Sequence, residues 1–127
     1  MDGQYKLSPS ETMAAYKDFT LYTTAEPCPK CATAIRWAGI KECVYGTSII
    51  TLIEQGWGQA DISSSEIFGR SSGLGTRTKL LGGVLANETD AYFAWQFTPE
   101  RAYFKGCERE GSAGHCLPLQ DEKHGEL

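Results

Sequence analysis

The first hundred residues switch repeatedly between short runs of β-branched and aromatic residues and segments whose apolar positions have helical spacing. Such a change of period is typical of strands alternating with helices. Segment 29–38 places Ile35 and Ala38 on one side and is followed by Gly39, a residue type that commonly ends helices. We predict helices at 8–19, 29–38 and 49–58, one helical turn near 64–68, and strands at 20–24, 42–48 and 80–85.

Tight connections join the strand at 20–24, the helix at 29–38 and the strand at 42–48. This order forms a βαβ unit, in which the two strands run parallel. The pattern therefore predicts an α/β protein, and we expect the brief strand at 20–24 to be buried.

The last third of the chain has weaker patterns. Segment 89–98 fits a helix by the spacing of its aromatic residues and a strand by their type. After Pro99 the sequence loses its period, and from residue 107 it is polar and contains glycine. We expect one folded domain at 1–106 and a flexible polar tail at 107–127.

Composition and charge narrow the functional classes. A chain of 127 residues with net charge −4 lacks the basic surplus of a protein that follows nucleic-acid phosphates. It has neither the ~18-residue apolar run of a membrane span nor an apolar signal-peptide core at its start. We therefore expect an intracellular protein, cytoplasmic or nuclear, with no membrane partner. Its five cysteines, an odd number, suggest thiols or metal ligands instead of disulfides.

The segment TAEPCPKCATAIRWAG, residues 24–39, carries the clearest chemistry. Cys28 and Cys31 stand two residues apart at the start of a predicted helix. Two thiolates at this spacing can hold one metal ion, and the helix N-terminus favours their ionised form. The same physics serves a redox dithiol, so the spacing alone leaves both possibilities open.

The longer segment LYTTAEPCPKCATAIRWAGIKECVYG, residues 21–46, closely resembles the second zinc motif of the cytidine and deoxycytidylate deaminase superfamily. Pro27, Cys28 and Cys31 reproduce the second half of the family signature, H-x-E followed by P-C-x-x-C. The resemblance covers roughly residues 8–98. Over this range the sequence is similar to small fungal-type deaminase-like proteins related to tRNA-adenosine and guanine deaminases.

This resemblance implies a three-layer α/β/α fold with a mixed sheet. It also implies a zinc ion held by one His or Cys and by two cysteines, here Cys28 and Cys31. In the family, zinc makes hydroxide available near neutral pH and the Glu of H-x-E moves the protons. The implied reaction is hydrolytic removal of an amine from a nucleobase, nucleoside or nucleotide.

The sequence departs from the family because no His precedes His115. We expect a fold that is N-terminally incomplete, with residues 1–106 forming the C-terminal portion of a deaminase-like domain. Two protein ligands without a third ligand or a general base predict an inactive or impaired deaminase. The missing H-x-E would come from an N-terminal segment lost from this chain or, less favoured, from a partner.

Three features resemble parts of the missing half. The tripeptide HGE at 124–126 has the H-x-E spacing but lies at the C-terminus, and the pair HC at 115–116 lies in the polar tail. We interpret both as chance matches. Glu26 stands two residues before Cys28, and we expect it to accept N–H bonds at the helix start. A direct catalytic role for Glu26 is the less favoured alternative.

Other functions remain open at this stage. The alternative interpretation is a non-catalytic deaminase-like structural or regulatory subunit that pairs as a homodimer or heterodimer. A thioredoxin-like dithiol protein is less favoured, because no Pro occurs between Pro29 and Pro99 to face the cysteines. The acidic balance favours a small nucleobase or nucleoside substrate over tRNA. Apolar faces left open by the missing half predict lower stability and a tendency to associate.

Overall fold

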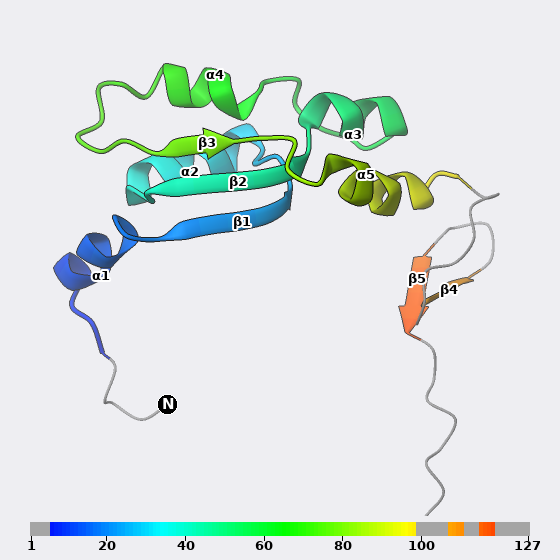
Figure 1. The fold of residues 1–127 in the computed structure, drawn as a ribbon, viewed down its shortest axis with the longest axis horizontal. Coiled ribbons are helices and arrows are strands. Elements are labelled where there is room, and N and C mark those ends of the chain that lie inside the picture. Colours follow the sequence, from blue (N-terminus) through cyan, green and yellow to red (C-terminus); the bar gives the residue numbers. More distant parts are fainter. Residues whose placement is uncertain (1–5, 99–106, 111–114, 119–127) are drawn as a thin grey trace, which may run out of the picture.

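The computed structural model describes residues 6–98, 107–110 and 115–118. Its main sheet has three strands in the order β1 (Thr20–Ala25), β2 (Glu42–Thr47) and β3 (Lys79–Leu81) (Figure 1). Both strand pairs are parallel. The predicted βαβ unit is therefore confirmed, and β2 is the central strand.

Helices lie on both faces of this sheet. The five helices described are α1 (Pro9–Tyr16), α2 (Pro29–Ala38), α3 (Ile49–Gln55), α4 (Ser64–Gly69) and α5 (Ala86–Trp95). One depression is lined by Leu21, Thr23 and residues of α2, and another by Tyr22, Thr24 and Thr89 of α5. Because neighbouring strand residues point to opposite faces, α2 and α5 cover opposite faces of the sheet. The α/β class is thus confirmed.

Local signals place most helix boundaries. Helix α1 begins with a capping box in which the Ser8 N–H donates to Glu11 Oε2 at 2.7 Å and the Glu11 N–H donates to Ser8 Oγ at 3.3 Å. Hydrogen bonding from the Ser8 backbone N–H, and next from the Ser8 hydroxyl, lowers the pKa of the Glu11 carboxyl. Helices α2 and α3 end at Gly39 and Gly56, both left-handed with φ of 73° and 109°. Segment 89–98, which fitted both patterns, falls mostly in helix α5.

The hydrophobic core is small and centres on β2. Its buried apolar residues are Ala32, Ile35, Cys43, Val44, Ile49, Leu52 and Trp95. Helix α5 contributes Trp95 to this core. It also contacts Trp57, whose indole N–H donates to the Phe93 carbonyl at 3.1 Å and whose ring packs edge-on against Phe93 and Phe97. Ala38 is half-buried and its neighbour Arg36 is buried, so the inner side of α2 is less apolar than expected.

Strand β1 is not the buried strand that its composition suggested. Tyr22 is 76% exposed and Leu21 36% exposed. The reason is its place in the sheet: among the described residues β1 pairs with β2 on one side and with no strand on the other.

Two further strands lie in the segment expected to be a flexible tail. β4 (Cys107–Glu110) and β5 (His115–Pro118) form a separate antiparallel pair with Cys107 opposite Pro118. The three-stranded sheet itself is parallel throughout its described part. The boundary near residue 106 and the flexibility of the tail stay predictions. No helix in the described ranges is both long and apolar enough to cross a membrane.

Candidate active site at the start of helix α2

The thiol pair lies at the start of α2, directly after β1. Pro29 occupies the first helical position, and Cys28 before it has the extended backbone of an N-cap residue, with φ of −63° and ψ of 164°. The Cys28 carbonyl accepts the Ala32 N–H at 2.8 Å, which closes the first turn. Cys28 is partly exposed and Cys31 exposed, and both are free thiols. The helix therefore presents both sulfur atoms at its N-terminal end, where anions are favoured.

The two thiols have opposite acidities. The backbone N–H of Cys31 lowers the pKa of Cys28, although the Cys28 side chain makes no full capping hydrogen bond, so we attribute the effect to electrostatic attraction. The Cys28 sulfur in turn raises the pKa of Cys31 by hydrogen bonding and by its charge. Cys28 therefore loses its proton at a lower pH than Cys31, and a divalent cation bound by both sulfur atoms would displace the protons of both.

An open depression of about 400 Å³ adjoins the thiols. Its walls come from β1, from the turn after it and from α2, and its lining residues are Leu21, Tyr22, Thr23, Ala25, Glu26, Pro27, Cys28, Cys31 and Ile35. Most of these side chains are apolar. The depression therefore offers apolar walls of the kind that hold a planar ring, and both cysteines are part of its lining.

Glu26 has a different place from the one expected. Its carboxylate accepts the Ile49 N–H at 3.0 Å through Oε1, and accepts the Ser64 N–H at 2.7 Å and the Ser64 hydroxyl at 2.8 Å through Oε2. Ile49 and Ser64 are the first residues of α3 and α4. The buried carboxylate thus satisfies the starts of these two helices and not the start of α2. These contacts are those of a structural residue.

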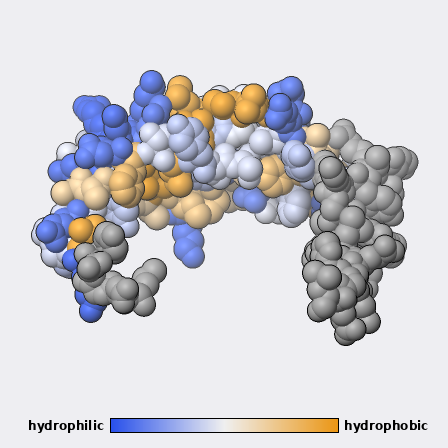
Figure 2. Space-filling view, turned by 60° about the horizontal axis from the view of Figure 1, so that its bottom comes forward, coloured by the Kyte–Doolittle hydropathy of each residue, from blue (hydrophilic) through white to orange (hydrophobic). Residues whose placement is uncertain are grey.

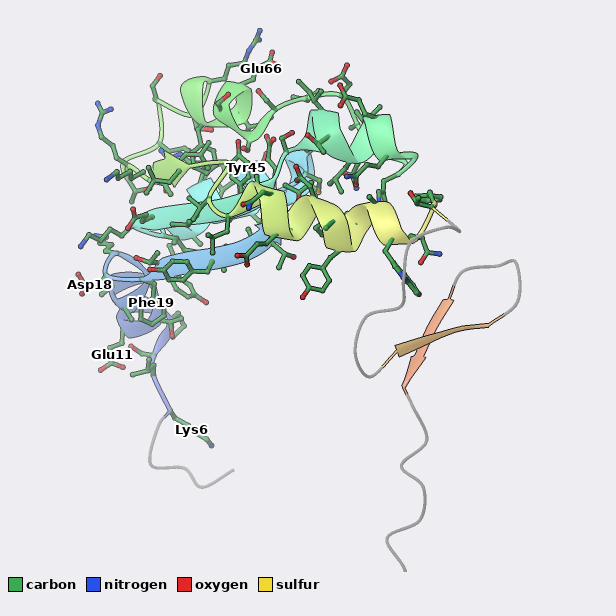
Figure 3. The ribbon with its side chains drawn as sticks, turned by 45° about the vertical axis from the view of Figure 1, so that its right-hand side comes forward. Lys6, Glu11, Asp18, Phe19, Tyr45 and Glu66 are labelled. Carbon is green, nitrogen blue, oxygen red and sulfur yellow. The ribbon has the colours of Figure 1, made fainter. Side chains whose placement is uncertain are left out.

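Tyr45 lies on the same side of the sheet as α4 (Figure 3). Burial raises the pKa of its phenol, and the charge of Glu26 raises it further. Glu66 of α4 points the other way, out into solvent, where its carboxylate lies 3.5 Å from Arg70 Nη2. Ser64 of α4 therefore faces inward and donates to Glu26, whereas Glu66 of the same helix faces solvent.

The described residues supply two thiols for a metal and no more. They contain no group of three or more His, Cys, Asp or Glu placed to hold one ion. Cys43 is fully buried in β2, and burial raises the pKa of its thiol. The His115 side chain and the HGE tripeptide at 124–126 lie outside what the structure describes. The chemistry of the thiol pair fits a zinc ligand, but this set does not complete a zinc site.

Sequence reasoning missed two residues near the site. Ser64 contacts Glu26 across 38 residues of sequence, and Arg36 is buried on the face of α2 toward α4. The available signal for Ser64 was the N-cap residue before it: the Ser63 hydroxyl accepts the Glu66 N–H, which makes Ser64 the first residue of α4. No local signal marked Arg36, because its acceptors lie 35 to 42 residues away.

Comparison with known proteins bears directly on this segment. Residues 5–47 match the family described as the cytidine and deoxycytidylate deaminase zinc-binding region. Over this segment the chain is similar to the cytidine deaminase-like superfamily. The matched region contains β1, both thiols, α2 and β2. The expected relationship is therefore confirmed.

Two individual proteins are similar to parts of this chain. A probable cytosine deaminase of Schizosaccharomyces pombe is 41% identical over 58 residues, which make up 42% of this chain and 36% of that protein. A solved guanine deaminase from Nitrosomonas europaea is 21% identical with a TM-score of 0.45, over 55% of this chain and 37% of that one. The chain thus spans little more than a third of the length of these two proteins.

Proposed function

We propose that this chain contributes the two-cysteine half of a zinc site in a hydrolytic deaminase of nucleobases, nucleosides or nucleotides. The observation that carries the proposal is the pairing of Cys28 and Cys31 at the N-terminus of α2, inside the segment that matches a zinc-binding region. Cys28 and Cys31 would be zinc ligands, and the lowered pKa of Cys28 favours the thiolate that zinc requires. Zinc bound in such a site supplies an activated water.

The substrate we propose is a small base or nucleoside. The similar proteins are named as deaminases of cytosine and guanine, and the depression beside the thiols has apolar walls suited to one planar ring. A tRNA substrate is the less favoured choice, because the net charge of −4 works against a polyanion.

We further propose that the chain by itself has little or no deaminase activity. The described residues offer two thiols, and Glu26, the nearest carboxylate in the sequence, already accepts three hydrogen bonds with its two oxygens. A third ligand and a general base would have to come from a partner or from sequence outside these residues. A non-catalytic deaminase-like subunit is the alternative that the same half-site supports.

Cobalt substitution tests the half-site directly. Purified chain, stripped with a chelator and reduced, is titrated with Co²⁺, and the near-ultraviolet thiolate-to-cobalt absorption is recorded. We expect Cys28→Ser and Cys31→Ser each to weaken the band strongly, while Cys43→Ala, which changes a buried thiol, leaves it in place. Zinc content after dialysis is measured in parallel. An undiminished band in both serine variants would overturn the assignment.

Turnover is a separate measurement. Ammonia release from cytosine, guanine and cytidine is followed with zinc-loaded chain, and we expect none above the Cys28→Ser background. Zinc-dependent release by the wild-type chain would show that the site is complete and would refute the proposed inactivity.

A further inference from the structure

A buried positive charge lies at the opposite end of α2 from the cysteines. Arg36 is only 3% exposed. Its guanidinium donates from Nη1 to Thr78 Oγ1 at 2.9 Å, and from Nη2 to the Thr76 carbonyl at 2.5 Å and the Ser71 carbonyl at 3.3 Å. All three acceptors are neutral. Among the described residues no carboxylate lies within the 4.0 Å of an ion pair with Arg36.

The surroundings of Arg36 add positive charge instead of balancing it. Burial lowers the pKa of Arg36, and the nearby charge of Arg77 lowers it further. The Phe68 ring, with its centroid 5.8 Å from the guanidinium carbon, is the other favourable contact of this charge. A guanidinium removed from water normally has an anion as its partner.

A cavity of about 420 Å³ opens beside this guanidinium. Arg36, Arg77 and Lys79 line it together with the hydroxyl-bearing residues Ser72, Thr76 and Thr78. Lys79, whose side chain is exposed, has an acid beside it: Glu42 Oε1 lies 4.0 Å from its Nζ. The cavity therefore gathers three cations and three hydroxyl groups around one space.

The sequence around this cavity is basic in an acidic chain. Residues 67–87 contain Arg70, Arg77 and Lys79 and no Asp or Glu, whereas the whole chain has a net charge of −4. The sequence predicted only a loop for most of this stretch, and the glycine-containing run from 71 to 78 does lie between α4 and β3. The positive charge of residues 67–87 has no role in the deaminase site proposed above.

We propose that this cavity binds the terminal phosphate of a small phosphorylated molecule. A phosphate dianion has the charge and the several acceptor oxygens that guanidinium, ammonium and hydroxyl donors satisfy together. The buried position of Arg36 suits a terminal phosphate that enters the cavity, and the acidic chain disfavours a polynucleotide. Eight residues of helix separate Arg36 from Cys28, about 12 Å at the usual helical rise. This site is thus independent of the thiol pair and of the proposed deaminase function.

Arg36 also has a structural task, which determines the choice of variants. It fastens the loop at 71–78 to α2, and Thr76 Oγ1 donates back to the Arg36 carbonyl at 3.4 Å. Removing Arg36 could unfold this region. Arg77→Ala and Lys79→Ala are better probes because both side chains are exposed at the cavity. The matched control is Arg70→Ala, which removes an exposed cation that is outside the cavity lining and pairs with Glu66.

Calorimetric titration with inorganic phosphate, AMP and adenosine tests the proposal on phosphate-free chain. We expect saturable binding of phosphate and AMP at one site per chain, and none of adenosine. Arg77→Ala and Lys79→Ala should each weaken AMP binding by about tenfold, and Arg70→Ala by less than about twofold.

Several results would overturn the phosphate site. These are the absence of saturable phosphate and AMP binding, equal losses in Arg70→Ala and Arg77→Ala, or equal affinity for AMP and adenosine. Binding of a single-stranded oligonucleotide without binding of phosphate or AMP would replace it with a polynucleotide surface. None of these results depends on the cobalt spectrum, so the two proposals stand or fall separately.

Discussion

At the scale of single residues, Glu26 is the contact on which the arrangement of α3 and α4 depends. One buried carboxylate accepts hydrogen bonds from the first residues of both helices, Ile49 and Ser64. Short helices of seven and six residues gain little from their own propensity, so such an acceptor weighs heavily in their stability.

The prediction for this residue concerns stability. Glu26→Gln keeps one acceptor oxygen and turns an amide NH₂ toward backbone or hydroxyl donors. We expect a loss of about 1–3 kcal/mol in the free energy of unfolding, measured by urea denaturation. Glu54→Gln, at an exposed position of α3, should change it by less than about 0.5 kcal/mol. Equal effects of the two substitutions would contradict the role given to Glu26.

The cysteine pair makes a prediction about pH. Only the thiolate reacts with iodoacetamide, and the pKa is lowered for Cys28 and raised for Cys31 and for Cys43. In chelated, reduced protein we therefore expect alkylation of Cys28 to set in at a lower pH than that of Cys31, with buried Cys43 protected throughout. Peptide mass spectrometry across a pH series gives each midpoint. A lower midpoint for Cys31 would contradict the assigned acidities.

At the scale of secondary-structure elements, a glycine allows α5 to approach the sheet. A Cβ placed on Gly46 of β2 would lie 2.5 Å from Thr89 Oγ1, 2.8 Å from Thr89 Cγ2 and 2.9 Å from the Thr24 carbonyl oxygen. Thr89 also accepts the Thr47 hydroxyl at 2.8 Å, which fixes the same contact. No alanine fits here unless Thr89 of α5 and the Thr24 carbonyl of β1 both move.

We predict that Gly46→Ala lowers the free energy of unfolding by about 1–3 kcal/mol through overpacking. The control is Gly58→Ala, because a Cβ at Gly58 meets no atom within 4 Å. Thermal melts of both variants give the comparison, with little change expected for the control. An unaltered melt of Gly46→Ala would mean that α5 sits farther from β2 than the structure shows.

Local signals explain which elements the sequence predicted well. Pro29 and Gly39 bracket α2, and the C-x-x-C spacing of the thiols is visible without any structure. Long-range contacts account for what the sequence missed. The acceptors of Arg36 and the donors to Glu26 lie 23 to 42 residues away in the sequence. The exposure of β1 follows from its pairing on one side only, which its own composition does not reveal.

At the scale of the whole molecule, β1 is an edge strand, because within the described part of the chain it pairs with β2 alone. The strand TLYTTA carries no charge, and Phe19, Leu21 and Tyr22 are exposed at or beside it. Figure 2 brings this side forward and shows apolar surface across the middle of the molecule. Uncharged, unpaired edge strands invite pairing with another chain.

Tyr22→Lys should therefore reduce self-association, because a lysine on an edge strand resists a second strand. Ile50→Lys, at an exposed apolar position of α3, serves as the control for added charge. Sedimentation velocity over a range of concentrations measures the effect. We expect concentration-dependent species in the wild type and in Ile50→Lys, and fewer of them in Tyr22→Lys. A wild-type chain that stays monomeric at all concentrations would refute the prediction.

The parallel strand order has a consequence during synthesis on the ribosome. β1 and β2 can pair once residue 47 has emerged, but β3 completes the sheet only after the 34 residues from Ser48 to Leu81 have followed. At ordinary translation rates that interval lasts roughly 2–7 s. During it β2 lacks its second neighbour, and Arg36 is without the carbonyl of Thr76 and the hydroxyl of Thr78. The nascent chain thus has a window of seconds in which a chaperone would find both edges of a two-stranded sheet open.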